Sequence, residues 1–269
     1  MSKISKLIKG ITTLVAKPYM INKIIDNEDV HMEACHKTYP QFKSGLPIID
    51  FRAVVPDASI EINPFAFMDG GSLVTDIALL KSLAGQKNDC QYFEIGTWRG
   101  ESVANVAAYA KDCFTLNLSE QDLYNLGLNE LIIKEQDSFS KNLNNVTHLK
   151  GNSLNFDFSP YHKKMDLVFI DGDHHYDAVK KDTEKAFKLL KDNESIMVWH
   201  DYAFNPERVR WDVFRGILDG TPAELRKNLY QVSNTMCAIY YPHPVKTIPI
   251  ETKYTADKKF IVNLSLGEL

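Results

Sequence analysis

The strongest constraint on the fold is a regular alternation of short apolar runs and helical stretches through the middle of the chain. Apolar runs at 91–95, 114–118, 146–149, 167–170 and 195–199 have the length and composition of buried strands. Helical patterns at 102–111, 120–142 and 178–191 separate most of them. Parallel strands need long, right-handed crossovers, so this order predicts a doubly wound α/β sheet with helices on both faces.

The two ends of the chain depart from this alternation. Apolar runs at 229–232, 236–241 and 260–266 lack comparable helices between them and predict an antiparallel edge. Residues 37–71 contain four prolines and end in Gly70 and Gly71, which indicates an irregular linker. We therefore predict an N-terminal helical extension and linker at 1–71 and a main domain at 72–269, which opens with a helix capped by Ser72.

Residues 1–36 have the periodicity of an amphipathic helix. Its apolar face is formed by Ile4, Leu7, Ile8, Ile11, Leu14 and Val15, whereas Lys3, Lys6, Lys9 and Lys17 lie on the rest of its surface. The favoured interpretation is a helix packed on the main domain or on a second subunit, which would make the protein a homo-oligomer. A contact with an anionic membrane surface is the alternative.

Composition narrows the class of protein. The 269 residues are 44% hydrophobic and 25% charged, as in an ordinary globular chain. Lys and Arg total 31 against 35 Asp and Glu, so the net charge of −4 gives no general attraction for nucleic acid. The four cysteines form no CxxC pair, and no apolar run approaches the roughly 18 residues of a membrane span. We expect reduced thiols and a cytoplasmic location.

A glycine-bearing turn follows the first predicted strand. Glycine lets the backbone approach a ligand, and the first amides of the following helix face the crevice where doubly wound folds bind ligands. However, the turn offers only Gly96 and Gly100, with Trp98 between them, so a dinucleotide GxGxxG fingerprint is absent. These residues alone do not distinguish a cofactor site from a tight structural turn.

Acids and histidines directly follow two of the later predicted strands. Asp171, His174 and their neighbours follow the strand at 167–170, and His200 and Asp201 follow the strand at 195–199. Neighbouring strand ends bring such groups together, where they can bind a metal or act as general acids and bases. A functional role is favoured for Asp171, His174 and Asp201. A structural role, such as capping the next helix, is favoured for Asp173, His175 and Asp177.

The string from Glu94 to Ser102 resembles motif I of the class I S-adenosylmethionine-dependent methyltransferases, in particular the branch of catechol O-methyltransferase. Further segments at 114–118, 151–153, 166–171 and 197–202 are similar to later strand ends of that family, in the same order, over about 90–205. The strings IDGDHHY and WHDY look most like a bacterial branch. The resemblance implies a Rossmann-like, mostly parallel, seven-stranded sheet that binds S-adenosylmethionine.

The resemblance also implies roles for single residues. The aligned positions place Asn117 where the family has an acid that bridges the ribose hydroxyls, so bidentate, charge-assisted recognition is lost, and Glu120 is a nearby substitute. The cofactor-binding residues would be Glu94, Gly96, Thr97, Trp98, Gly100 and Ser102 around the methionine part, Asn117 at the ribose, Asn152 and Ser153 beside the adenine, and Asp171.

Metal-dependent members of the family hold a divalent ion at positions that correspond to Asp171, His200 and Asp201. An imidazole ligand suits manganese, iron or zinc better than magnesium. The family's catalytic base falls on His174, with Asp201 as its catalytic partner. The function implied is O-methylation of a small hydroxylated acceptor molecule, assisted by a metal.

Two other functions fit the same residues. A metal-dependent hydrolase could use the Asp and His side chains to activate water. A catalytically silent binding module could retain the fold without the chemistry, and the departure at Asn117 supports it. Further along, Trp211 and Phe214 are candidates for an acceptor pocket, but a helical stripe of Val213, Phe214, Ile217 and Leu218 is more typical of core.

Overall fold

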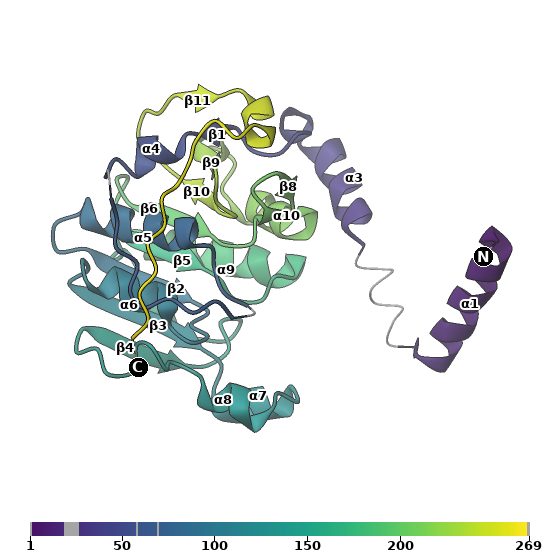
Figure 1. Ribbon diagram of the computed structural model, residues 1–269, viewed down its shortest axis with the longest axis horizontal. Coiled ribbons are helices and arrows are strands. Elements are labelled where there is room, and N and C mark those ends of the chain that lie inside the picture. Colours follow the sequence, from purple (N-terminus) through teal and green to yellow (C-terminus); the bar gives the residue numbers. More distant parts are fainter. Residues whose placement is uncertain (1, 19–26, 58, 69, 268–269) are drawn as a thin grey trace. The chain divides into compact units, whose positions relative to one another are not determined.

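A large mixed sheet organises most of the chain (Figure 1). In the computed structural model, which describes residues 2–18, 27–57, 59–68 and 70–267, its strand order is β11-β1-β9-β10-β6-β5-β2-β3-β4. The strands from β4 to β6 are parallel, whereas β10 is antiparallel to both of its neighbours. The predicted doubly wound α/β fold with an antiparallel edge is confirmed. The strands of this sheet are β1 (Ile48–Ile49), β2 (Gln91–Ile95), β3 (Asp112–Asn117), β4 (Val146–Lys150), β5 (Leu167–Ile170), β6 (Ile196–Trp199), β9 (Leu229–Val232), β10 (Ala238–Tyr240) and β11 (Thr247–Ile248).

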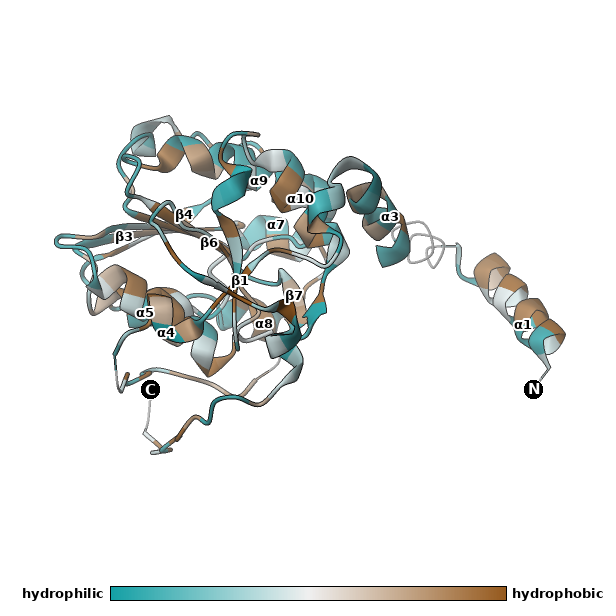
Figure 2. Cartoon of the chain, turned by 90° about the horizontal axis from the view of Figure 1, so that it is seen from above, coloured by the Kyte–Doolittle hydropathy of each residue, from teal (hydrophilic) through white to brown (hydrophobic). Residues whose placement is uncertain are grey.

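Helices cover both faces of the sheet. Figure 2 shows α9 and α10 on one face and α4 and α5 on the other. A separate hairpin of β7 and β8 follows β6. The remaining elements are α4 (Phe51–Val54), α5 (Val74–Gly85), α6 (Glu101–Ala107), α7 (Glu120–Asn125), α8 (Glu130–Lys134), η3 (Ser159–Tyr161), α9 (Tyr176–Leu189), β7 (Ala203–Asn205), β8 (Arg208–Val209), α10 (Trp211–Gly220), η4 (Arg226–Asn228) and η5 (Ile250–Tyr254).

The central strands are buried because helices cover both of their faces. Every residue of β5 and β6 is buried, which explains why these strands appear in the sequence as continuous apolar runs rather than alternating ones. On one face of the sheet (Figure 2), α10 packs on α9 and buries the stripe Val213, Phe214, Ile217 and Leu218. These four side chains are therefore core, as the helical spacing indicated.

The structure departs from the sequence predictions in four places. The predicted irregular linker contains β1, whose two isoleucines pair in parallel with β9; a run of two residues is too short to be recognised as a strand. The expected strand at 260–266 is absent, because this segment forms no ladder and its apolar side chains stay exposed. The expected helix at 120–142 is divided, since Asn129 caps a new helix by accepting a hydrogen bond from the Leu131 amide. With β1 and β11 added, the sheet has nine strands among the described residues instead of seven.

A further difference concerns the start of α5. Ser72 is not its cap: the helix begins at Val74, with Leu73 in the N-cap position. The side chain of Asp76, in the first turn, accepts a hydrogen bond from the Leu73 amide at 2.8 Å. An acid in the first turn also suits the positive end of the helix dipole. The sequence pattern therefore located this helix but assigned its cap to the wrong side chain.

The chain separates into two compact units, Met1–Lys43 and Ser44–Leu269. The second unit thus begins ahead of the predicted boundary at residue 72. The first contains α1 (Lys3–Ala16), α3 (Glu28–Thr38) and η2 (Pro40–Phe42), and the part of the predicted helix at 19–26 lies outside the described residues. No residue of α1 is buried. None of the helices in the described ranges is long and apolar enough to cross a membrane.

Candidate functional site

Three neighbouring parallel strands end level with one another and define an edge of the sheet. Ile170 of β5 pairs with Ile95 of β2 on one side and with Trp199 of β6 on the other. The residues that follow these three, namely Gly96, Asp171 and His200, therefore emerge side by side. After β2 the chain first adds β3 and β4 on one side and then crosses to β5 on the other. Such a switch point is where doubly wound sheets bind ligands.

The glycines of the turn after β2 make room for the protein's own atoms. Gly96 has a φ of 95°, and a Cβ there would lie 2.0 Å from the backbone oxygen of Asp171. Gly100 has a φ of 83°, and its Cβ would lie 2.2 Å from Oγ of Ser140. Both positions require glycine for left-handed backbone and for space, irrespective of any ligand. The interpretation as a tight structural turn therefore accounts for both glycines.

A segment that sequence reasoning did not assign to the site lies beside this turn. The amides of Asp137 and Phe139 donate to the carbonyls of Trp98 and Arg99, each at 2.9 Å. Trp98 itself has a φ of 47°, and its indole Nε1 is buried with no hydrogen-bond partner among the described residues. A donor buried in this way costs free energy unless a partner binds it. The sequence did not predict this contact, because about forty residues separate the two segments that form it.

Glu94 is enclosed by hydroxyl groups beneath the turn. The Tyr92 hydroxyl donates to its carboxylate at 2.5 Å, and the Thr115 hydroxyl donates at 3.3 Å. The Thr97 hydroxyl lies 2.5 Å from that of Thr115 and extends the network. Complete burial raises the pKa of Glu94 to about 8, although hydrogen bonds from Tyr92 and Ser102 act in the opposite direction. In this arrangement Glu94 stabilises the turn through hydrogen bonds on its buried side.

The residues expected near the ribose and adenine lie at two further strand ends. Asn117 ends β3, where its amide donates to the side-chain oxygen of Gln136 and its own oxygen accepts from the Leu118 amide at 3.0 Å. Asn152 follows β4 and accepts from the Leu154 amide at 2.9 Å, as a turn residue does. Ser153 acts on the buried Asp182, whose pKa burial raises to about 6 while Ser153 opposes that rise. The cofactor roles of Asn117, Asn152 and Ser153 stay predictions.

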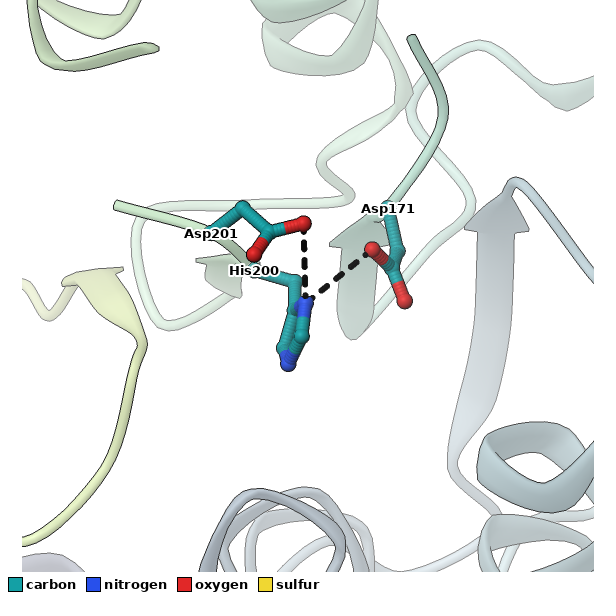
Figure 3. Close-up of side chains that lie close together, drawn as sticks. All are labelled: Asp171, His200 and Asp201. Carbon is teal, nitrogen blue, oxygen red and sulfur yellow. Dashed lines mark ion pairs between the residues drawn. The ribbon is translucent and has the colours of Figure 1, made fainter. Parts of the chain in front are cut away.

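Asp171, His200 and Asp201 converge at the ends of β5 and β6 (Figure 3). Nδ1 of His200 lies 3.2 Å from Oδ1 of Asp171 and 3.4 Å from Oδ2 of Asp201. One ligand atom from each residue falls within 4.8 Å of the other two. The three residues that the sequence predicted as metal ligands are therefore brought together.

The charges around His200 are tightly coupled. Burial alone would lower the pKa of His200, but the carboxylates of Asp171 and Asp201 outweigh it and hold this pKa well above its ordinary range. Burial alone would raise the pKa of Asp201, but the positive charge of the adjacent His200, with smaller contributions from His174 and Arg210, brings it down to about 2. Asp201 also has a φ of 53°, a left-handed conformation that aspartate adopts more readily than most residues.

The donor set fits a divalent metal. Although the two carboxylates are close to Nδ1 of His200, neither is aligned with it as a hydrogen bond, so this buried nitrogen has no hydrogen-bond partner within the described part of the chain. A nitrogen aimed between two carboxylate oxygens is a suitable ligand for manganese, iron or zinc. A divalent cation would also offset the negative charge of the two acids.

The remaining residues of the predicted cluster lie at the rim of the site and at the start of α9. Nε2 of His174 lies 3.1 Å from Oδ2 of Asp201, which places this histidine at the rim of the site. Asp173 instead pairs with His175 through Nδ1 at 2.5 Å, and both are exposed. His175 occupies the N-cap of α9 but makes no capping hydrogen bond with its side chain. Asp177 follows in the first turn of the same helix.

Sequence reasoning missed one acid of the site. Asp76 of α5 is completely buried, and its Oδ2 and Nε2 of His200 are hydrogen-bonded at 3.2 Å. A signal was available, because Asp76 precedes Leu80 and Leu83 by one and two turns and thus lies on the apolar face of its helix. An acid on a buried face needs a partner, but the sequence does not indicate which one.

Comparison with known proteins bears on the same stretch. Residues 93–202 match the model of a family described as a methyltransferase domain. The match runs from β2 to just beyond His200 and Asp201 and covers less than half of the chain. It confirms the predicted methyltransferase domain for this part of the chain.

Similar individual proteins have been identified as well. The uncharacterized protein R132 of Acanthamoeba polyphaga mimivirus is 28% identical over 137 residues, which are 48% of this chain and 61% of that protein. The chain thus spans less than two thirds of this relative. Among solved structures, the SAH-bound Podospora anserina methyltransferase PaMTH1 is 16% identical with a TM-score of 0.43, over 66% of this chain and 82% of that one. Cofactor-bound Rv0187 from MTB is 18% identical with a TM-score of 0.44, over 68% and 85% of the two chains.

Proposed function

We propose that this protein is an S-adenosylmethionine-dependent methyltransferase of the branch that resembles catechol O-methyltransferase. The observation that carries the proposal is the match of residues 93–202 to a methyltransferase domain. This stretch contains the three strands whose ends are level and the acid and histidine cluster that follows them. The activity, the cofactor and the acceptor of the whole protein all belong to this proposal.

The cofactor would bind at the switch point beside β2. S-adenosylmethionine supplies a methyl group carried on a sulfonium. The candidate residues are distributed over adjacent strand ends, with Thr97 and Ser102 near the turn, Asn117 after β3, and Asp171 after β5. Nε1 of Trp98, which is buried and has no hydrogen-bond partner in the described ranges, is an additional donor at the turn. Glu94 would act indirectly, because its carboxylate is enclosed by hydroxyls.

The cluster beyond β5 and β6 suits O-methylation of a small hydroxylated acceptor. A metal held by Asp171, His200 and Asp201 would align the acceptor hydroxyl and lower its pKa. In the transfer, the acceptor oxygen forms a bond to the methyl carbon, the carbon–sulfur bond breaks, and sulfur keeps the electron pair. His174 would receive the hydroxyl proton on Nδ1, because its Nε2 faces Asp201 at 3.1 Å. Asp201 would thereby orient the base.

Calorimetric titration of the full chain tests this proposal. S-adenosylmethionine and S-adenosylhomocysteine are each titrated with and without Mn²⁺, and methyl transfer from labelled S-adenosylmethionine is assayed on phenols, catechols and sugars. We expect both nucleosides to bind and Mn²⁺ to increase the turnover of a hydroxylated acceptor. Absence of binding by both nucleosides would contradict the methyltransferase proposal.

A pair of variants separates the metal from the cofactor. Asp171→Asn removes a predicted ligand, whereas Asp173→Asn removes an exposed acid two residues away that pairs with His175. We expect only the first to weaken Mn²⁺ binding, and we expect the second to behave as wild type. Chelator-sensitive hydrolysis of ester or phosphate substrates without nucleoside binding would favour the hydrolase. Nucleoside binding without turnover on any acceptor would favour the silent binding module.

A further inference from the structure

Asp76 is held by four donors that tie together three distant parts of the chain. Its Oδ2 accepts from the Leu73 amide at 2.8 Å and lies within hydrogen-bond distance, 3.2 Å, of Nε2 of His200. Its Oδ1 accepts from the Met236 amide at 2.9 Å and from Sγ of Cys237 at 3.6 Å. The start of α5, the end of β6 and the turn between β9 and β10 are thus joined through one completely buried carboxylate.

This environment fixes which nitrogen of His200 carries hydrogen. The two amides can only donate, and an ionised carboxylate can only accept, so Nε2 of His200 must donate to Asp76. In the neutral ring Nδ1 is then the nitrogen with a lone pair. That lone pair points toward Oδ1 of Asp171 and Oδ2 of Asp201, at 3.2 and 3.4 Å, without an aligned hydrogen bond to either. A divalent cation between these three atoms would accept the lone pair and take the place of a proton on Nδ1.

We propose that Asp76 is a positioning residue that holds His200 in the tautomer that presents Nδ1 to a divalent metal between Asp171 and Asp201. The inference rests on the metal-assisted form of the proposed function. An acid that binds the far nitrogen of a ligating histidine fixes the orientation of the ring and increases its basicity as a ligand. Asp76 does so from a helix that lies outside the stretch matched by the methyltransferase family, since that stretch begins at residue 93.

The first test is Mn²⁺ binding by the full chain, measured from the electron paramagnetic resonance signal of free Mn²⁺. In Asp76→Asn, an NH₂ group replaces one of the two carboxylate oxygens and faces groups that themselves donate hydrogen. Because the support of His200 is weakened, we expect a loss of about 10-fold to 100-fold in Mn²⁺ affinity. Cys237→Ala removes another contact of Asp76 and leaves the bond to His200, so we expect its Mn²⁺ affinity to equal that of wild type. Thermal unfolding of both variants reports their stability separately.

The second test needs no variant. Two-dimensional ¹⁵N NMR of the imidazole rings in the Zn²⁺-loaded wild-type protein reports the tautomer of His200. We expect hydrogen on Nε2 and metal on Nδ1. The opposite tautomer would overturn the inference, as would an Asp76→Asn protein that is less stable but binds Mn²⁺ as tightly as wild type.

The outcomes also distinguish this inference from the function on which it rests. If wild type binds S-adenosylmethionine but no metal, the role of Asp76 and the metal are both wrong and the methyltransferase proposal stands. If wild type binds Mn²⁺ and the Asp76→Asn protein binds it equally well, the metal site stands and only the role of Asp76 is wrong. If wild type binds Mn²⁺ but neither nucleoside, the methyltransferase proposal fails independently.

Discussion

Single residues at the turn after β2 serve the protein's own packing as much as any ligand. Gly96 and Gly100 are required because a Cβ would collide with Asp171 and Ser140. Glu94 occupies the interior of the same turn, completely buried and surrounded by hydroxyls. A turn built in this way is stiff, and a stiff turn holds the neighbouring strand ends in register, as precise positioning of reacting groups requires.

The buried Glu94 should make stability depend on pH. Its pKa is raised from 4.5 to about 8 in the folded protein, so the folded state holds a proton that the unfolded state releases between these values. The contribution of Glu94 to the free energy of unfolding should therefore be greatest below about pH 4.5, decrease as pH rises toward 8, and level off above it. Glu94→Gln lacks this proton, so its stability relative to wild type should increase by up to about 1.4 kcal/mol per pH unit in that window.

Urea unfolding of both proteins at several pH values between 5 and 8 measures this difference. Glu207→Gln, which removes an exposed acid, is the control for a change of one charge. Parallel curves for wild type and Glu94→Gln across the window would show that Glu94 does not hold the extra proton.

At the scale of elements, α1 has an apolar face that is exposed among the described residues. Ile4, Leu7, Ile8, Ile11 and Val15 are all more than half exposed. The helix contains three lysines and no acid, whereas the whole chain has an excess of acids. A continuous apolar face on a helix is typical of an interaction surface. We propose that α1 joins two copies of the chain, with the basic helix on an acidic partner surface.

Light scattering combined with gel filtration tests this association. Wild type should form a dimer, and Ile8→Lys, on the apolar face, should shift it toward monomer because a charge would be buried at the contact. Thr13→Lys adds the same charge to the polar face, between Lys6 and Lys9, and should leave the dimer intact. A monomeric wild type that floats with anionic vesicles would instead support the membrane alternative.

For the whole molecule, the main question is where the folded unit begins. Ser44–Leu269 forms one compact unit, and its sheet includes β1 between β9 and β11. Ile48 and Ile49 are buried, as are Phe51, Val54 and Val55 that follow them. Burial of such side chains stabilises by about 1.5–3 kcal/mol each. Together they approach the whole stability of a typical domain, about 5–15 kcal/mol.

Two truncations should therefore behave differently. A chain of residues 44–269 should unfold cooperatively at a temperature close to that of the full protein. A chain of residues 72–269 should aggregate or melt far lower, because it lacks β1 and exposes the edge of β9. Circular dichroism during heating measures both. Equal melting temperatures would instead support the boundary predicted at residue 72.

The sequence by itself determined the order of the central strands and helices, because their apolar runs are continuous and their length distinguishes the two. It also indicated that Asp171, His174, His200 and Asp201 follow neighbouring strands, since parallel strands end at a common edge. The resemblance over 90–205 then supplied the proposed function, and residues 93–202 match the model of a methyltransferase domain.

Only the tertiary structure decided which contacts are made over long stretches of chain. Asp76 meets His200 across 124 residues, and Ile48 pairs with Gln231 across an even longer separation. The same holds for the two glycines, whose partners, Asp171 and Ser140, come from later segments. Local sequence patterns predict whether a residue lies in a helix or a strand. The partner of a buried acid, or of a two-residue strand, is instead determined by the packing of the whole chain.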